Sequence, residues 1–203
     1  MRIAIIGAGS VGRHLAQGCR RLGHDVAIGV RDPDDPKHHD VEGRSTVADA
    51  VAGAALAIIA VPASALPDLL ATLAVEPPTI VVDATNAVGA PVPGGAETVG
   101  AYVRSRLPAD VPVVKAFDTI GAEHLVDGTI DGRAAFLPIA GDPEGCEVVL
   151  GLARDLGFDA VALGGPEAIG LVEDHARLWI HLMRSGWGRS FGFAVIGDHG
   201  GRS

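Results

Sequence analysis

The 203-residue sequence predicts a Rossmann-type α/β fold, doubly wound, in which helices cover both faces of a mostly parallel sheet. Three observations support this fold. Short apolar runs alternate with helical patterns along the chain, the first run leads into glycines at GxGxxG spacing, and a helix with an apolar stripe follows those glycines. Rossmann dinucleotide sites have this order of strand, glycine turn and helix.

The glycine turn is predicted to bind a dinucleotide. The buried strand runs from Ile3 to Ile6, and the glycines are Gly7, Gly9 and Gly12. Gly7 allows a sharp turn, Gly9 lacks the Cβ that would keep a pyrophosphate from the backbone, and Gly12 lets strand and helix pack closely. The free N–H groups at the start of the helix then face the phosphates.

Composition and charge describe one compact domain. The chain is 48% hydrophobic and carries a formal net charge of -9 without any run of Lys or Arg, so neither nucleic acid nor an anionic membrane is expected as a partner. The first strand begins at residue 3 and no apolar run reaches the length of a membrane span, so a cytoplasmic protein is expected. Cys19 and Cys146 form no motif, which predicts two buried thiols and no metal site.

Apolar runs and turn residues predict the elements. The expected strands span residues 3–6, 25–30, 55–61, 79–83, 111–117, 134–140 and 159–163. The expected helices span residues 11–22, 45–51, 64–73, a segment ending near 107, 143–156 and 166–187. The polar loop 32–44 leaves room only for a short third strand, or for none.

Residues at the end of the second strand determine whether a Rossmann fold binds NAD or NADP. An acidic residue there would bind the adenosine ribose and repel a 2′-phosphate. The sequence instead has Val30 and Arg31, with Lys37 and His38 a few residues on in a polar loop. NADP(H) is therefore predicted, although a solvated loop charge explains Lys37 equally well.

Later strands end at the edge of the sheet where the nicotinamide should lie. Val61 and Pro62 close one strand and could wall the nicotinamide or simply end the strand. Asn86 follows the next strand and could hold a cofactor hydroxyl or carboxamide, or stabilise its own turn. Lys115 lies in an apolar strand, where a charge is costly unless it snorkels or finds a partner.

The C-terminal region is expected to be a small extension. Residues 1–165 would form the NADP-binding Rossmann domain, and residues 166–203 a helix and tail that pack on it or on a second subunit. A stripe at helical spacing comprises Leu171, His175, Leu178 and Leu182. It favours a core or interface role for His175, and the apolar helix favours a homodimer, although a helix buried in its own subunit would show the same pattern.

Several segments together resemble a known family. They are Gly7 to Gly12, Gly29 to Arg31, Ile58 to Pro62, Val82 to Asn86, Val113 to Thr119, and the helix around Leu178 and Trp179. Over nearly its full length the chain resembles the F420H2:NADP+ oxidoreductase-like family, which includes the NADPH domain of membrane metalloreductases. The most specific element is Lys-Ala-Phe-x-Thr after the sixth strand.

The resemblance implies a Rossmann domain that binds NADPH and a flat acceptor ring. By position it implies that Ser10 and Val11 approach the phosphates, Arg31 the 2′-phosphate, and Val61 and Pro62 the nicotinamide side.

Two residues depart from the family pattern. Val30 stands where members often carry a small hydroxyl residue, which costs one phosphate hydrogen bond. Asp118 replaces an Asn, exchanging an amide that can donate for a group that, when ionised, only accepts. The second change could alter which acceptor binds.

The leading hypothesis is hydride transfer between NADP(H) and a planar redox cofactor, the deazaflavin coenzyme F420. Such a transfer depends on stacked rings more than on an acid or base, and no Ser-His-Asp set, Lys-Tyr pair or metal cluster is evident. One alternative is an NADPH-dependent reductase of an imine or activated alkene, with Asp118, His124 or His175 as proton donor. A flavin acceptor and a non-catalytic NADP(H)-binding module also stay open.

Overall fold

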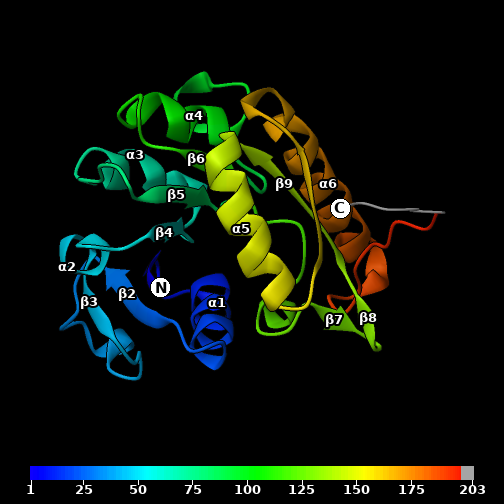
Figure 1. The fold of residues 1–203 in the computed structure, drawn as a ribbon, viewed down its shortest axis with the longest axis horizontal. Helices are drawn as coiled ribbons and strands as arrows, with labels where there is room; N and C mark the ends of the chain where they lie inside the picture. Colours follow the sequence, from blue (N-terminus) through cyan, green and yellow to red (C-terminus); the bar gives the residue numbers. More distant parts are fainter. Residues whose placement is uncertain (198–203) are drawn as a thin grey trace.

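The computed structural model describes residues 1–197, which form an eight-stranded sheet with helices on both faces (Figure 1). Residues 198–203, the end of the predicted C-terminal extension, lie outside the described residues. The sheet strands are β1 (Arg2–Ile6), β2 (Asp25–Val30), β3 (Arg44–Thr46), β4 (Leu56–Ile59), β5 (Ile80–Asp83), β6 (Val113–Lys115), β9 (Phe136–Gly141) and β10 (Asp159–Gly164).

The strand order is β10-β9-β6-β5-β4-β1-β2-β3. Strands β1 to β6 pair in parallel, β9 runs antiparallel to β6, and β10 is parallel to β9. β7 (Thr129–Ile130) and β8 (Arg133–Ala134) form a separate small hairpin. The predicted Rossmann-type, mostly parallel fold is confirmed, and the short third strand is β3.

Six α-helices lie within the described residues. They are α1 (Ser10–Arg21), α2 (Val47–Val51), α3 (Leu66–Leu70), α4 (Val99–Arg106), α5 (Pro143–Asp155) and α6 (Ile169–Leu182). Short 3₁₀ turns occupy Pro36–His38, Ala63–Ala65, Pro93–Gly95, Ala122–Leu125 and Pro166–Ala168, and a π turn occupies Met183–Trp187. Within residues 1–197 no helix is both long and apolar enough to span a membrane.

The core has one layer on each face of the sheet, because side chains alternate along every strand. Ile3 and Ile5 point toward α1 and α5, whereas Ala4 and Ile6 point toward α2, α3 and α4. α6 packs on β9 through a smaller cluster that includes Ala140. Cys19 in α1 and Cys146 in α5 are buried free thiols, as the sequence predicts.

Several boundaries differ from the prediction. The strand expected to reach Phe117 ends at Lys115, because Phe117 has a left-handed φ of 66° and leaves the extended conformation. The helix expected over 64–73 has a 3₁₀ start and ends as an α-helix at Leu70. The helix expected over 45–51 begins at Val47, because Thr46 is its cap and its hydroxyl accepts from the Asp49 amide at 3.1 Å.

The predicted stripe of α6 is not the face that packs on the sheet. Leu171 and Leu178 are 58% and 49% exposed, whereas Val172, Ala176 and Trp179 are buried. Both sets of residues have helical spacing, so periodicity alone could not choose between them. The helix predicted to continue to Trp187 changes to the π turn after Leu182, with Gly186 at φ 98°.

Candidate functional site

The three glycines of the first turn face different surroundings. A Cβ on Gly7, whose φ is 117°, would lie 2.5 Å from the carbonyl oxygen of Ala60, and a Cβ on Gly12 would lie 2.0 Å from the carbonyl oxygen of Gly7. The fold itself therefore requires glycine at both positions. A Cβ on Gly9 would meet nothing within 4 Å, so the backbone there is open to a ligand. This open backbone fits the close approach of a pyrophosphate.

The amino end of α1 offers donors to the same place. No side chain caps this helix end, so its first N–H groups are available to a phosphate. Ser10 is exposed, with its hydroxyl 3.4 Å from Nδ1 of His14, and Val11 is half-buried. A phosphate at this turn would lie beside both residues.

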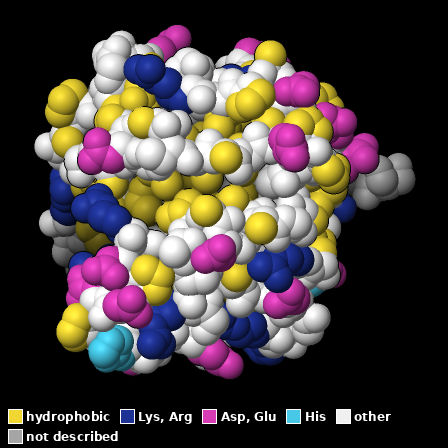
Figure 2. Space-filling model, turned by 90° about the vertical axis from the view of Figure 1, so that its left-hand side faces the viewer, with side chains coloured by type: hydrophobic (Ala, Val, Ile, Leu, Met, Phe, Trp, Pro, Cys, Tyr) yellow, Lys and Arg dark blue, Asp and Glu magenta, His cyan; other side chains and the backbone are white. Residues whose placement is uncertain are grey.

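A cavity of about 340 Å³ opens at the carboxyl ends of β1, β2 and β4, next to this turn. Its walls include Gly7, Arg31, His38 and Val61. Figure 2, seen from the side of α2 and α3, shows a hollow with a hydrophobic floor and Lys or Arg side chains at its left-hand end. The cavity places an exposed guanidinium where a 2′-phosphate would bind, beside the glycine turn.

Of three residues predicted to contact the cofactor, one lines this cavity and two lie outside its lining. Val61 lines the cavity together with Arg31, whereas Pro62 is exposed and lies outside the lining, and their predicted place beside the nicotinamide stays a prediction. Lys37 also lies outside the lining and forms an exposed ion pair with Asp35, at 2.5 Å between Nζ and Oδ2. His38 lines the cavity in its place. The polar loop contained no periodicity that could have distinguished His38 from Lys37.

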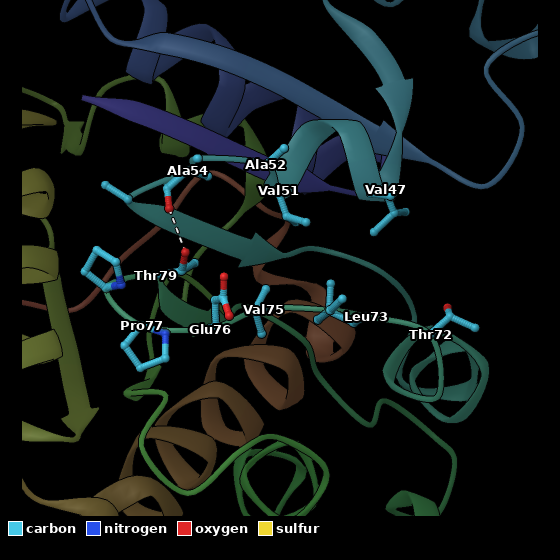
Figure 3. A pocket seen from close by; sticks show the side chains of 15 residues that line it. Val47, Val51, Ala52, Ala54, Thr72, Leu73, Val75, Glu76, Pro77 and Thr79 are labelled. Atoms are coloured by element: carbon cyan, nitrogen blue, oxygen red, sulfur yellow. Dashed lines mark hydrogen bonds between the residues drawn. The ribbon is translucent and has the colours of Figure 1, made fainter.

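A larger cavity, of about 600 Å³, adjoins the first one at Val47 and Thr72 and extends toward the amino ends of the strands (Figure 3). It is formed by α2 and the segment before β5, with Val51 among its apolar walls and a hydrogen bond from the Thr79 hydroxyl to the Ala54 carbonyl at 2.8 Å. Ligands of open α/β sheets bind at the carboxyl ends of the strands. This cavity flanks the amino ends of β4 and β5, so it is not the candidate dinucleotide site.

A fully buried lysine lies at the carboxyl ends of β5 and β6. Lys115 Nζ donates to Asp83 Oδ2 at 2.9 Å and to the Thr85 carbonyl at 2.5 Å. It also lies 3.5 Å from Asp118 Oδ2 and 3.7 Å from Glu173 Oε1. We call Lys115, Asp83, Asp118 and Glu173 the Lys115 cluster. The costly buried charge noted in the sequence thus has three carboxylate neighbours.

The topology brings these groups together. Asp83 and Lys115 are register partners at the last pair of β5 and β6, and their side chains point toward α4 and α6. Glu173 comes from α6 and also accepts from the Gly100 amide at 3.0 Å, in the first turn of α4. Two acidic partners were missed from the sequence. Asp83 could have been identified as a partner of Lys115 from the sequence, because the two strands end in opposite charges at the same edge of the sheet. No local sequence pattern marks Glu173 as a partner.

The cluster shifts the pKa values of its members. Burial alone would lower the pKa of Lys115, but Asp83, Asp118 and Glu173 outweigh it and raise the pKa above its usual value, so the lysine stays charged. Burial raises the pKa of Asp118 to about 7, against the opposing charge of Lys115. Neither carboxyl oxygen of Asp118 has a hydrogen-bond partner in residues 1–197. Asp118 can therefore hold a proton near neutral pH.

Asn86 connects this cluster to the crevice. Its Nδ2 donates to the backbone carbonyl of Asp118 at 2.6 Å, so it fixes the segment after β6. Asn86 also lines a cavity of about 500 Å³ between the loop after β5 and the second half of α6. The basic side chains in this wall are Arg177, His181 and Arg184.

The two histidines proposed as proton donors lie outside the cluster. The ring of His175 packs edge-on to Phe136 and Phe193, with centroids 5.5 and 4.6 Å away, and burial lowers its pKa. His124 is half-buried in a 3₁₀ turn, and its Nε2 has no partner among the described residues. In that part of the chain no hydrogen bond or ion pair joins either ring to Asp118.

Comparisons of the sequence find related oxidoreductases. Residues 2–87 match the model of the family described as NADP oxidoreductase, coenzyme F420-dependent. Pyrroline-5-carboxylate reductase of Mycobacterium tuberculosis is 34% identical over 128 residues, which is 60% of this chain and 42% of that protein. The enzyme of the same name from Mycobacterium leprae is 33% identical over 67% of this chain and 47% of its own length. The chain thus spans less than half the length of these relatives.

Solved structures extend the likeness to nearly the whole chain. A candidate F420-dependent NADP reductase from Arthrobacter sp. FB24 has a TM-score of 0.83 at 26% identity. The superposition covers 97% of this chain and 100% of the Arthrobacter chain. A hypothetical protein from Sinorhizobium meliloti has a TM-score of 0.72 at 26% identity, over 98% and 96% of the two chains. An imine reductase from Aspergillus terreus, with a TM-score of 0.64 and 18% identity over 90% of this chain and 61% of its own, shares the fold alone.

Proposed function

Because the chain belongs to the F420H2:NADP+ oxidoreductase-like family, we propose that it binds NADP(H) and transfers a hydride between the nicotinamide and an acceptor beyond β5. The observation that carries this proposal is the single cavity that joins the glycine turn to Arg31. When bound, the nucleotide supplies or accepts the hydride. The protein supplies the phosphate site at Gly9 and α1, the 2′-phosphate contact at Arg31, and the crevice that holds the acceptor.

The test of this proposal compares two nucleotides. Arg31→Ala removes a charge-assisted contact to the 2′-phosphate, worth about 1.5–3 kcal/mol, so NADPH affinity should fall by roughly tenfold or more. NADH affinity should change little, because NADH has no 2′-phosphate. Fluorescence titration measures both, with Lys37→Ala as the matched control. Equal losses for NADPH and NADH would refute the role of Arg31.

We propose the deazaflavin F420 as the leading acceptor. The family description, the full-length likeness to the Arthrobacter protein and the Lys-Ala-Phe-x-Thr segment support this choice. Stopped-flow mixing of protein, NADPH and oxidised F420, then of FMN and FAD, measures the loss of acceptor absorbance. Fast reduction of F420 alone is the expected result. Reduction of flavins instead would assign the protein to a flavin-reducing branch.

A second candidate is the NADPH-dependent reduction of an imine. Asp118 favours it, since a buried carboxyl group with a pKa near 7 can donate a proton to the imine nitrogen when the hydride adds to the imine carbon. The names of the mycobacterial relatives also support it. Asp118→Asn should then abolish imine turnover while NADPH binding survives. His124→Gln and His175→Gln are the parallel tests, and turnover that survives all three changes would eliminate this mechanism.

Binding of NADPH without reduction of any acceptor would favour the remaining alternative. The protein would then act as a non-catalytic NADP(H)-binding module.

A further inference from the structure

We propose that the 500 Å³ cavity between residues 86–92 and α6 is an anion subsite, so that the hydride acceptor carries a phosphate or carboxylate group that binds Arg184. The inference rests on the proposed hydride transfer and names the chemical class of the acceptor. We call this cavity the Arg184 cavity.

The position of the Arg184 cavity follows from the strand order. The adenosine end of the nucleotide is assigned to Arg31, at the end of β2. From β2 the sheet continues through β1 and β4 to β5, and the Arg184 cavity begins at Asn86, just beyond β5. An extended dinucleotide with its adenosine over β2 points its nicotinamide toward β5. The Arg184 cavity is therefore on the acceptor side of the nicotinamide.

The charge of this cavity is opposite to that of the chain. Arg177, His181 and Arg184 line it, although the chain as a whole has a formal net charge of -9. The acidic side chain in its wall is Glu173, whose Oε1 is already held by Lys115 and by the Gly100 amide. These contacts offset part of the charge of Glu173, and three basic side chains in the wall outnumber this one carboxylate.

The two arginines have different partners. Arg177 pairs with Asp174 one turn earlier on α6. Arg184 has no ion pair and donates no hydrogen bond in the part of the chain that the structure describes. A guanidinium presents a planar fork of donors that matches phosphate and carboxylate oxygens. Arg184 is consequently the group that can bind an incoming anion without losing an existing partner.

The backbone opposite Arg184 leaves room for this anion. Gly89 has φ 73°, and a Cβ built on it would lie 3.9 Å from Nη2 of Arg184, so the guanidinium faces the loop at close range. Arg184 itself belongs to the π turn after α6. Residues Val88 to Ala90 are exposed, which keeps the entrance open to solvent.

The experiment compares acceptors that differ only in the anionic group. Protein saturated with NADP+ is titrated by calorimetry with FMN and riboflavin, and with pyrroline-5-carboxylate and 1-pyrroline. The anionic member of one pair should bind at least about tenfold more tightly than its neutral counterpart. Preference within the flavin pair identifies phosphate as the bound group, and preference within the pyrroline pair identifies carboxylate. Saturation with NADP+ keeps the probes out of the nucleotide cavity.

Two variants assign the preference to the cavity. Arg184→Gln should bind both members of the pair with similar affinity, whereas Arg184→Lys should keep part of the preference because it retains the charge and loses the fork. Arg154→Gln is the matched control, since Arg154 is an exposed arginine at the end of α5. Melting curves confirm that each variant is folded.

Two results would overturn the inference. One is equal affinity for both members in both pairs, and the other is a preference that survives Arg184→Gln. The NADPH titration is independent of this test. If the parent protein does not bind NADPH, the proposed function is refuted. If it binds NADPH but shows no preference for the anionic probes, only the subsite is refuted.

Discussion

Asp118 is unusual among the carboxyl groups of the chain, because it is buried beside a lysine and yet no donor binds its oxygens in residues 1–197. Burial raises its pKa from the ordinary 3.8 to about 7. Between these values the folded protein holds a proton that the unfolded chain has released. The free energy of unfolding contributed by Asp118 is therefore lost as pH rises through this window and changes little outside it.

Asp118→Asn should flatten this pH dependence. An amide does not titrate, so the variant should gain stability relative to the parent as pH rises from about 4 to about 7. Urea unfolding across this range measures the free energy of both proteins. Parallel profiles for the two proteins would show that Asp118 ionises normally in the folded state.

Lys115 should be the most sensitive residue of its cluster. Lys115→Met would leave Asp83 and Glu173 buried without their cation, and breaking a buried ion pair in this way costs about 3–5 kcal/mol. Urea unfolding measures the loss, and adding Asp83→Asn to the variant should recover part of it. A loss below about 1 kcal/mol would mean that water reaches the cluster.

At the scale of elements, two substitutions in the glycine turn between β1 and α1 should distinguish a glycine that the ligand requires from a glycine that the fold requires. Gly9→Ala places its Cβ in open space, so the melting temperature should hold while NADPH affinity falls at least about tenfold. Gly12→Ala forces its Cβ onto the carbonyl of Gly7, so both the melting temperature and the affinity should fall. Unchanged NADPH binding in folded Gly9→Ala would place the pyrophosphate elsewhere.

The sequence was sufficient for the elements that local patterns encode. Apolar runs located β1, β2, β4 and β5 because parallel strands buried on both faces have continuous hydrophobic sequences. The glycine spacing located the open backbone at Gly9. These features depend on neighbours within one strand or one turn, so no knowledge of the tertiary fold was needed.

Features that depend on distant contacts were not predictable. The end of β6 is determined by the left-handed conformation of Phe117, which no residue type in the segment requires. The packed face of α6 is selected by β9, and the sequence of α6 carries two apolar stripes. Glu173 reaches Lys115 only after the chain has formed the last two strands and returned across the sheet. Such partners are properties of the folded chain.

At the scale of the whole molecule, the homodimer stays a prediction. Leu171 and Leu178 on the outer face of α6 are the apolar surface that tests it. A dimer through this face should sediment at about twice the 20.7 kDa of the chain, and changing both residues to glutamate should yield a monomer that still binds NADPH. Sedimentation of the unchanged protein as a monomer would contradict the prediction.

Glu173 ties the first half of α6 to Lys115 of β6 and to the Gly100 amide of α4. Detaching the first half of α6 would remove Glu173 from Lys115, which is buried away from water. The backbone amide protons of this half of α6 should therefore exchange with solvent only on global unfolding. The π turn beyond Leu182 has no buried residue, and its amide protons should exchange through local fluctuations. The wall that carries Arg184 can therefore fluctuate on its own while the sheet beneath it stays closed.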